Sequence, residues 1–209
     1  MTRRAATVRR LKAAAKAKAI VEVHRRRLDP LPIRAFVVEV GPEWVVLEPI
    51  RDRLDFDGYD AVRIRDISEV LASPKAGFLH RVLRAKHLSP KRPKIEGTDL
   101  VALLRSICAS YGVVVIDRER LYPDSVDIGA ICESTSKDFR VIWLSPTAMW
   151  ERDDRRYAFR DVTHLGFGGE YEMTLVRMAG LPPKEVEVPG TPKRKRTAKV
   201  QGRKSSRTG

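Results

Sequence analysis

Apolar and polar residues alternate with a period of two in the first third of the chain, a pattern typical of half-buried β-strands. The run AFVVEV at 35–40 and the run WVVLEP at 44–49 predict two strands joined by a Gly-Pro-Glu turn. The run AVRIR at 61–65 predicts a third strand, with its apolar side chains toward the core and its arginines toward solvent. Ile67 and Val70 complete an all-β unit.

Helices are predicted where apolar residues recur at three- and four-residue spacing. One such stripe comprises Phe78, Leu79, Val82 and Leu83. A second helix is predicted from an N-cap at Thr98 to an end at Gly112, and we expect it to be the most deeply buried helix. A last helix is predicted at 170–179, because Gly180 and Pro182 follow it.

A second β region lies between these helices. Its strands are expected at 113–116, 130–133, 139–144 and 156–159. The Gly-Phe-Gly-Gly segment at 166–169 then leads into the last helix, as a phosphate-binding loop or as a tight turn. The turn is favoured, because the Lys-Ser/Thr of a P-loop is absent and Glu170 and Glu172 would satisfy the helix dipole themselves.

The two ends of the chain differ from the middle. Residues 5–27 predict a helix, because Ala, Lys and Arg are good helix formers and no Gly or Pro interrupts them. Pro30 and Pro32 end it, since proline disfavours helical geometry in the residue before it. Beyond Pro183 the chain is rich in Lys, Arg, Ser, Thr, Gly and Pro, a composition that predicts a disordered tail.

The two β regions resemble each other in sequence. Shifting 35–70 by 95 residues places it on 130–165 without a gap, and the motif R-D-[IV]-[ST] then recurs at 65–68 and 160–163. In each copy the Asp is expected to cap the turn after its strand by accepting backbone N–H groups.

Agreement between the faces of the strands supports this repeat. Only four positions are identical, but the inward and outward positions agree, with Trp44 meeting Phe139 as a core residue. A slip of one residue would exchange the faces. The pattern therefore predicts a repeated structural unit.

A unit of about 40 residues with four or five short strands can bury itself by curling into a small barrel. The segment DVTHLGFGGEYE, from Asp161 to Glu172, resembles the ending of uncharacterised bacterial proteins with two small Sm-like β-barrel modules and linking helices. The resemblance spans roughly 31–180 and implies the fold alone. The Asn-bearing RNA-pocket motif and the Arg-Gly motif of true Sm proteins are absent, so the Sm uridine pocket cannot be assigned to any residue.

The sequence thus predicts an α+β fold of two small Sm-like β-barrel units joined by helices, with an N-terminal basic helix and a disordered basic C-terminal tail. The expected parts are a basic helical arm at 1–29, a first barrel at 30–72, a helical linker packing on the barrels at 73–112, a second barrel with the terminal helix at 113–181, and the tail at 182–209.

The net charge of +14 is concentrated at the two ends. Residues 1–28 hold ten Lys and Arg and one acidic residue, and 182–209 hold nine and two, which leaves 22 and 24 for the middle. Basic ends on a near-neutral body favour arms that attract a polyanion. The expected nucleic-acid-binding residues are Arg9, Arg10, Arg25, Arg26, Arg27, Lys193, Arg194, Lys195, Arg196, Arg203 and Lys204. The cluster at 193–196 could equally be a solubilising end.

No pattern predicts a catalytic residue, a cofactor or a metal site. The four histidines, at 24, 80, 87 and 164, are scattered, and no C-x-x-C is present. Ser145 has no nucleophile elbow around it. Cys108 and Cys132 carry no motif and fit a reduced cytoplasmic setting.

We therefore expect a non-enzymatic cytoplasmic protein that binds RNA or another polyanion through basic arms on a two-barrel scaffold. The alternative is a protein–protein interaction scaffold, whose barrel strand edges pair with a partner or with a second copy. No membrane partner is expected, because no apolar stretch approaches the ~20 residues of a span. The basic N-terminus lacks the apolar core of a secretory signal, although its composition is compatible with a transit peptide.

Overall fold

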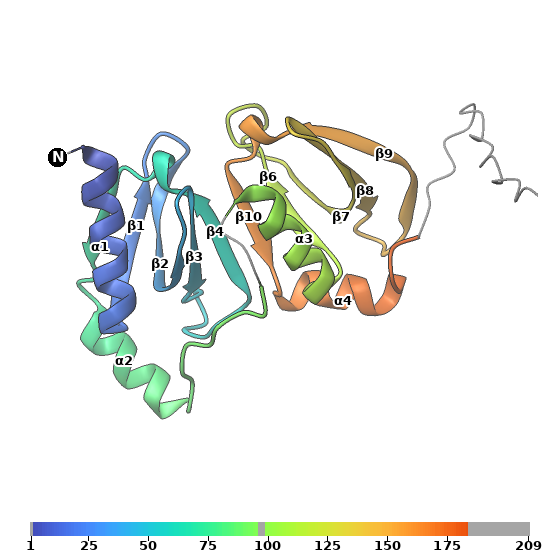
Figure 1. Ribbon diagram of the computed structural model, residues 1–209. Helices are drawn as coiled ribbons and strands as arrows, with labels where there is room; N and C mark the ends of the chain where they lie inside the picture. The colour runs from blue at the N-terminus through green and yellow to red at the C-terminus, as the bar shows by residue number, and fades with distance from the viewer. Residues whose placement is uncertain (1, 96–98, 184–209) are drawn as a thin grey trace, which may run out of the picture.

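The computed structural model describes residues 2–95 and 99–183 of the chain. The elements in chain order are α1 (Arg3–Ala17), β1 (Ile20–Arg25), β2 (Asp29–Val40), β3 (Trp44–Pro49), β4 (Tyr59–Arg63), η1 (Ile64–Asp66), β5 (Glu69–Ala72), α2 (Ala76–Ala85), α3 (Leu100–Tyr111), β6 (Val114–Asp117), β7 (Val126–Ser134), β8 (Asp138–Leu144), β9 (Trp150–Ala158), η2 (Phe159–Asp161), β10 (His164–Phe167) and α4 (Glu170–Ala179). Figure 1 shows them as two halves side by side. In the described ranges no helix is both long and apolar enough to cross a membrane.

These ten strands form one antiparallel sheet, in the order β5-β1-β2-β3-β4-β10-β6-β7-β8-β9. Strands β4 and β10 pair at the centre, where Val62 lies opposite His164. Strands β5 and β9 are the two ends of the sheet and do not pair with each other. The prediction of two Sm-like barrels is therefore wrong, because a single open sheet runs through both halves. Each half finds a partner for its edge strand in the other half, so neither has to close on itself to satisfy that backbone.

Each half nevertheless repeats the same order of elements. A helix, five strands, a 3₁₀ turn before the fifth strand and a closing helix occur in both. The turns η1 and η2 begin at residues 64 and 159, and β5 and β10 begin at 69 and 164, so the 95-residue spacing of the sequence repeat is kept. The prediction that 35–70 and 130–165 form similar strand arrangements is confirmed.

The gap-free alignment, in contrast, is wrong in the first hairpin of the repeat. Val40 pairs with Val45 in the β2–β3 hairpin, and Ser134 pairs with Phe139 in the β7–β8 hairpin. Phe139 therefore corresponds to Val45 and not to Trp44. A slip of one residue exchanges the faces of a strand. Trp44 accordingly packs into the core of the second half, although it lies in the first.

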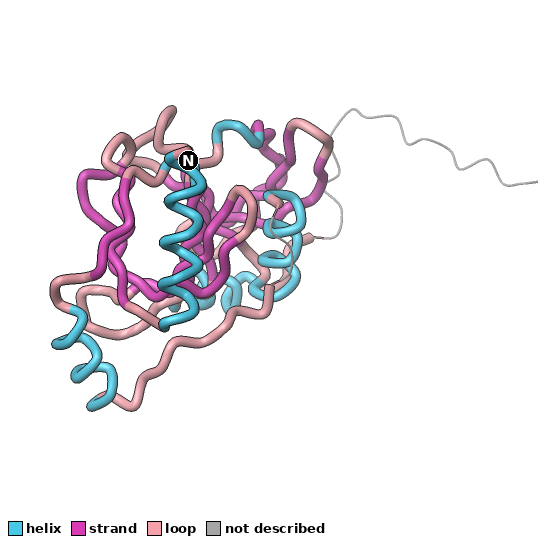
Figure 2. The backbone as a smooth tube through the Cα atoms, turned by 60° about the vertical axis from the view of Figure 1, so that its left-hand side comes forward, coloured by secondary structure: helices cyan, strands magenta, loops and turns pink. Residues whose placement is uncertain are grey.

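The N-terminal 29 residues are part of the folded body and not a helical arm. Helix α1 ends at Ala17, where Lys18 adopts a left-handed conformation with φ of 48°. Strand β1 follows and lies between β5 and β2, so the helix predicted over 5–27 is wrong beyond residue 17. The run IVEV at 20–23 buries its valines, and β-branched side chains favour strands over helices. Figure 2 shows α1 lying across the strands of the first half.

Helices α1 and α3 occupy equivalent places in the two halves. Leu11 and Ala14 of α1 pack on the strands of the first half. Helix α3 buries Leu100, Leu103, Leu104 and Ile107 in the core of the second half. Helix α2 belongs to the first half, where Leu79 and Leu83 pack with Phe36. The expected linker at 73–112 is therefore divided between the halves.

The buried helix predicted from Thr98 begins slightly later than expected. The N-cap is Asp99, whose carboxylate accepts hydrogen bonds from the backbone N–H groups of Val101 and Ala102. Thr98 lies outside the described residues. Asp at an N-cap satisfies backbone donors that have no partner within the helix.

Candidate anion-binding site

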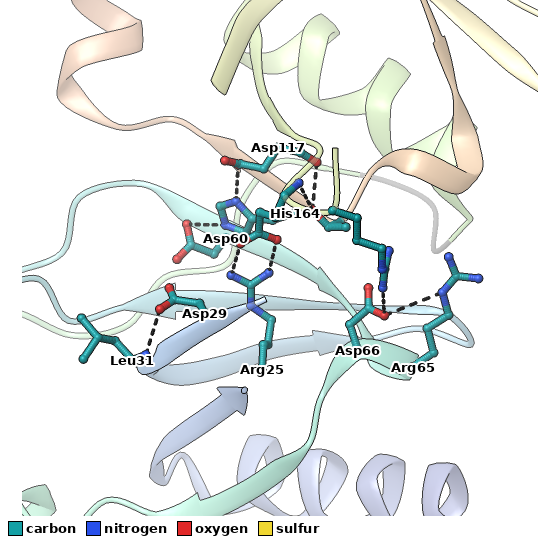
Figure 3. A network of polar contacts seen from close by, with 11 residues as sticks. Arg25, Asp29, Leu31, Asp60, Arg65, Asp66, Asp117 and His164 are labelled. Atoms are coloured by element: carbon teal, nitrogen blue, oxygen red, sulfur yellow. Dashed lines mark hydrogen bonds and ion pairs between the residues drawn. The ribbon is translucent and has the colours of Figure 1, made fainter. Parts of the chain in front are cut away.

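Polar side chains meet where the two halves join. His164, the first residue of β10, lies between Asp60 of β4 and Asp117 of β6 (Figure 3). Its Nε2 lies 3.2 Å from an oxygen of Asp60, and its Nδ1 lies 2.5 Å from an oxygen of Asp117. Arg51 contacts the Asp60 carboxylate from the other side, at 3.0 Å. The two basic residues, His164 and Arg51, thus neutralise the two carboxylates where strands of both halves meet.

The protonation of His164 follows from these neighbours. Burial alone would lower its pKa, but the carboxylates of Asp60 and Asp117 outweigh burial and raise the pKa to about 10. Burial would likewise raise the pKa of Asp60, yet His164 and Arg51 lower it. The imidazolium of His164 and the carboxylate of Asp60 are therefore charged at neutral pH, and the imidazolium donates a hydrogen bond from each nitrogen.

A second ion pair joins the halves beside this histidine. Arg25 is only 4% exposed, and its two terminal nitrogens donate to Glu119 at 2.7 and 2.9 Å. Burial would raise the pKa of Glu119, but its hydrogen bond from Arg25 helps to lower it. The guanidinium of Arg25, a predicted nucleic-acid-binding residue, is thus already engaged by a carboxylate inside the protein.

Arginines line a hollow at the same junction. The hollow has a volume of about 280 Å³. It is lined by Arg3, Arg27, Leu28, Arg65, Asp66, Ile67, Ser68 and Arg120. Four guanidinium groups thus surround a space that holds a single carboxylate, an excess of three positive charges.

Four separate segments place these arginines. Arg3 begins α1, and its Nη2 donates to the backbone carbonyl of Ser68 at 2.7 Å. Arg27 lies in the turn between β1 and β2 and has no polar partner in the described part of the chain. Arg65 lies in η1 of the first half, whereas Arg120 comes from the loop after β6 of the second half. Arg120 is the one lining residue that the second half contributes.

Asp66 orients two of the four arginines. Its side chain is 6% exposed and forms an ion pair with Arg120, while Nε of Arg65 lies 3.9 Å away (Figure 3). The prediction that this Asp caps backbone N–H groups is therefore wrong for the first copy of the motif, since Oδ1 of Asp66 accepts from Arg120 and Oδ2 has no hydrogen-bond partner among the described residues. The carboxylate instead holds guanidinium groups at the rim of the hollow.

The neighbouring guanidinium of Arg63 is surrounded by charges of both signs. Burial lowers the pKa of Arg63, and the charges of Arg65 and Arg120 lower it further. The charges of Asp66 and Glu43 raise the same pKa. Like charges disfavour the charged form of a group and opposite charges favour it.

The residues predicted to bind nucleic acid are spread over different settings. Arg9 and Arg10 are exposed on α1, and Arg26 forms an exposed ion pair with Glu69 at 2.9 Å. Of the predicted residues that the structure describes, only Arg27 lines the hollow. The predicted tail residues Lys193, Arg194, Lys195, Arg196, Arg203 and Lys204 lie outside the described residues.

Sequence reasoning missed three arginines of the hollow, namely Arg3, Arg65 and Arg120. The repeated R-D motif was a usable signal for Arg65, but it was assigned to turn capping. Arg120 carried no signal, because it reaches Asp66 from 54 residues away. The described residues include no cluster of three or more His, Cys, Asp or Glu that could hold a metal ion.

Comparisons with protein-family models, with curated proteins and with solved structures found no match to the chain.

Proposed function

We propose that this protein binds the phosphate backbone of single-stranded RNA, or of a similar polyanion, at the arginine hollow and without strong base preference. The observation that carries the proposal is the arrangement of four guanidinium groups around a space with one carboxylate. Guanidinium groups recognise phosphate through paired hydrogen bonds and stay charged at all physiological pH values.

The partial enclosure of the hollow supports a localised phosphate contact. Arg120 and Arg65 are held by Asp66, so little side-chain freedom is lost when a phosphate binds. Arg27 has no competing partner among the described residues and is available to a ligand. Charges in a recess also act more strongly than the same charges on an open surface.

Helix α1 extends the basic surface away from the hollow. Its exposed cations after Arg3 are Arg4, Arg9, Arg10, Lys12 and Lys16. A flexible single strand that places one phosphate in the hollow can follow this helix with the next ones. Phosphate contacts of this kind carry no base information, so we expect weak sequence preference.

The proposal describes a binding protein without catalysis, acting in the cytoplasm. Cys108 and Cys132 are free thiols, which is compatible with a reducing compartment. Localisation of a fluorescent fusion of the full chain, together with an assay of RNA integrity after incubation, tests these two parts.

Replacing Arg3 and Arg27 together by alanine is expected to weaken RNA binding and to make it less salt-dependent. Each cation that neutralises a phosphate contributes about 0.7 to the slope of log affinity against log salt, so losing two should reduce the slope by about 1.4. Fluorescence anisotropy with a labelled single-stranded RNA of mixed sequence, over a series of salt concentrations, measures the slope.

The matched control replaces Arg81 and Arg84 by alanine. Both are exposed on α2 and lie outside the hollow, so the net charge falls equally. A chain ending at Pro183 repeats both comparisons without the basic tail and keeps every described element. If the slope of log affinity against log salt decreases equally in the Arg3/Arg27 variant and in the control, RNA binding depends on the total charge and the hollow is not the binding site.

A further inference from the structure

The two halves of the chain are joined through unlike edges. Strand β4 is the last strand of the first half in the sheet order, and β10 is the first strand of the second half. By the repeat, β9 corresponds to β4, and β5 corresponds to β10. The two outer strands of the sheet, β5 and β9, therefore each have one unpaired edge. These two edges correspond to the edges of β10 and β4 that pair with each other inside the chain.

We propose that copies of this chain associate head to tail, with β9 of one copy pairing antiparallel to β5 of the next in the register of the internal β4–β10 pair. In that register Glu69 lies opposite Tyr157, as His164 lies opposite Val62, and Ala72 lies opposite Asp154, as Phe167 lies opposite Tyr59. The partner is a second copy of the same chain, and the inference does not depend on the proposed RNA binding.

The first supporting observation is a charge pair that recurs with reversed signs. Inside the chain, His164 of β10 contacts Asp60 of β4 at 3.2 Å. The equivalent residues are Glu69 of β5 and Arg155 of β9, 95 positions earlier and later respectively. The internal contact joins a positive His164 on β10 to a negative Asp60 on β4. The contact between copies would join a negative Glu69 on β5 to a positive Arg155 on β9, so it is attractive too.

The third member of the internal cluster, Asp117, is replaced by a histidine. Asp117 lies opposite His164 in the β6–β10 pair, and His24 lies opposite Glu69 in the β1–β5 pair. The internal cluster places His164 between Asp60 and Asp117. The equivalent cluster between copies would place Glu69 between His24 of the same copy and Arg155 of the next copy. Glu69 already carries Arg26 at 2.9 Å, and its side chain is 35% exposed, so it is accessible to a neighbour.

The second supporting observation is an Asp–Arg pair that recurs with the same signs. Asp66 of η1 pairs with Arg120, which is the third residue after Asp117. The equivalent residues are Asp161 of η2 and Arg27, the third residue after His24. Asp161 pairs only with its neighbour Arg160 in the described chain, and Arg27 has no polar partner there. Head-to-tail pairing would bring Asp161 to Arg27 of the next copy.

One internal contact has no attractive counterpart. The buried pair of Arg25 and Glu119 corresponds to Arg118 and Arg26, which have like charges. Arg118 already pairs with Asp127 at 2.9 Å. The contact between copies therefore lacks the strongest ion pair of the internal junction, and we expect it to be weaker and dependent on concentration.

The charges on the end strands also explain why pairing would be selective. Charged side chains on an edge strand prevent it from pairing with arbitrary partners. Strand β9 carries Arg155 and Arg156, and β5 carries Glu69 beside Leu71, an apolar residue that is 40% exposed. Strand β9 as a whole has as many acidic as basic residues, and Arg155 already pairs with Glu151 at 3.3 Å. The preference for β5 therefore depends on the placement of Arg155 next to Glu69 and not on the total charge of the strand. Such a heterologous contact builds a closed ring or an open filament, according to the rotation between copies.

Sedimentation velocity of the nuclease-treated full-length chain over a series of concentrations tests the proposal. The wild type should form assemblies larger than a monomer. Glu69→Arg brings like charges together at positions 69 and 155, which are diagonal neighbours in this register, and so does Arg155→Glu. Each variant alone should therefore weaken association by at least about tenfold. An equimolar mixture of the two should regain the assembly. In the mixture the arginine introduced at position 69 meets the glutamate introduced at position 155, and the unchanged Glu69 of one variant meets the unchanged Arg155 of the other.

Matched charge reversals away from the edges serve as controls. Glu133→Arg on the interior strand β7 and Arg105→Glu on α3 change the net charge equally and should assemble as the wild type does. A monomeric wild type at every concentration overturns the proposal. So does a loss confined to one variant with no recovery in the mixture, the result expected for a contact between like edges. Glu69 and Arg155 do not line the arginine hollow, so RNA binding by both variants can be checked separately.

Discussion

Replacing His164 by glutamine is expected to remove about 3–5 kcal/mol from the free energy of unfolding at neutral pH, because breaking a buried ion cluster leaves uncompensated charges inside the protein. The side chain of His164 is 17% exposed and lies between the carboxylates of Asp60 and Asp117. Glutamine can still donate a hydrogen bond but carries no positive charge. Urea unfolding followed by circular dichroism measures the loss.

The same variant should change the pH dependence of stability. The pKa of His164 rises from 6.5 to about 10 on folding, so the folded state holds the proton more tightly than the unfolded state does. The stabilisation is complete below pH 6.5 and is lost as the pH rises toward 10. The gap in unfolding free energy between wild type and His164→Gln should therefore shrink over this range.

A histidine outside the network provides the control. His87 is exposed just after the end of α2, and His87→Gln should keep the stability and the pH profile of the wild type within about 0.5 kcal/mol. A gap between wild type and His164→Gln that stays constant from about pH 6 to about pH 10 would show that His164 contributes by packing and not by its charge.

Replacing Leu104 by alanine is expected to cost about 2–5 kcal/mol of unfolding free energy, the range for deleting a large side chain from a close-packed core. Leu104 is 0% exposed and belongs to the cluster with Phe139, Val141 and Tyr157. Helix α3 covers the strands of the second half at this point, so a cavity there is enclosed on several sides. Urea unfolding again provides the measurement.

Leu121 is the matched control, because it is 52% exposed in the loop after β6. Leu121→Ala removes the same atoms and should cost about 0.5 kcal/mol or less. A loss below about 1 kcal/mol for Leu104→Ala would mean that the face of α3 is not a core surface.

Local patterns were sufficient for most of the secondary structure. The last helix, predicted at 170–179, is observed as α4 over Glu170–Ala179. Composition predicts the first helix too far along the chain, because good helix formers continue past Ala17 into strand β1, which buries Ile20, Val21 and Val23. A few apolar residues in a short strand are a weak signal beside a long run of helix-favouring composition.

The candidate site could be predicted only in part. Arg27 was recognised from the charge of the N-terminal segment, and Arg65 lay in a motif noticed for its repetition. Arg25 lies only two residues from Arg27, but its guanidinium is buried and paired with Glu119, which is 94 residues away in the chain. Charge counts along a chain cannot distinguish an arginine that is already paired inside the fold from one that remains available.

Local patterns predict the repeated strands within 35–70 and 130–165 and most of the helices but not β1, since periodicity, turn residues and caps act over a few neighbouring positions. The tertiary structure alone decided that the repeats share one open sheet and do not close into barrels, because the choice depends on which strand satisfies an edge backbone. The pairing of β4 with β10 also brings His164 between two carboxylates and adds Arg120 to the three arginines that the first half contributes to the hollow. The hollow joins residues as far apart in the chain as Arg3 and Arg120, and no local pattern carries information over such separations.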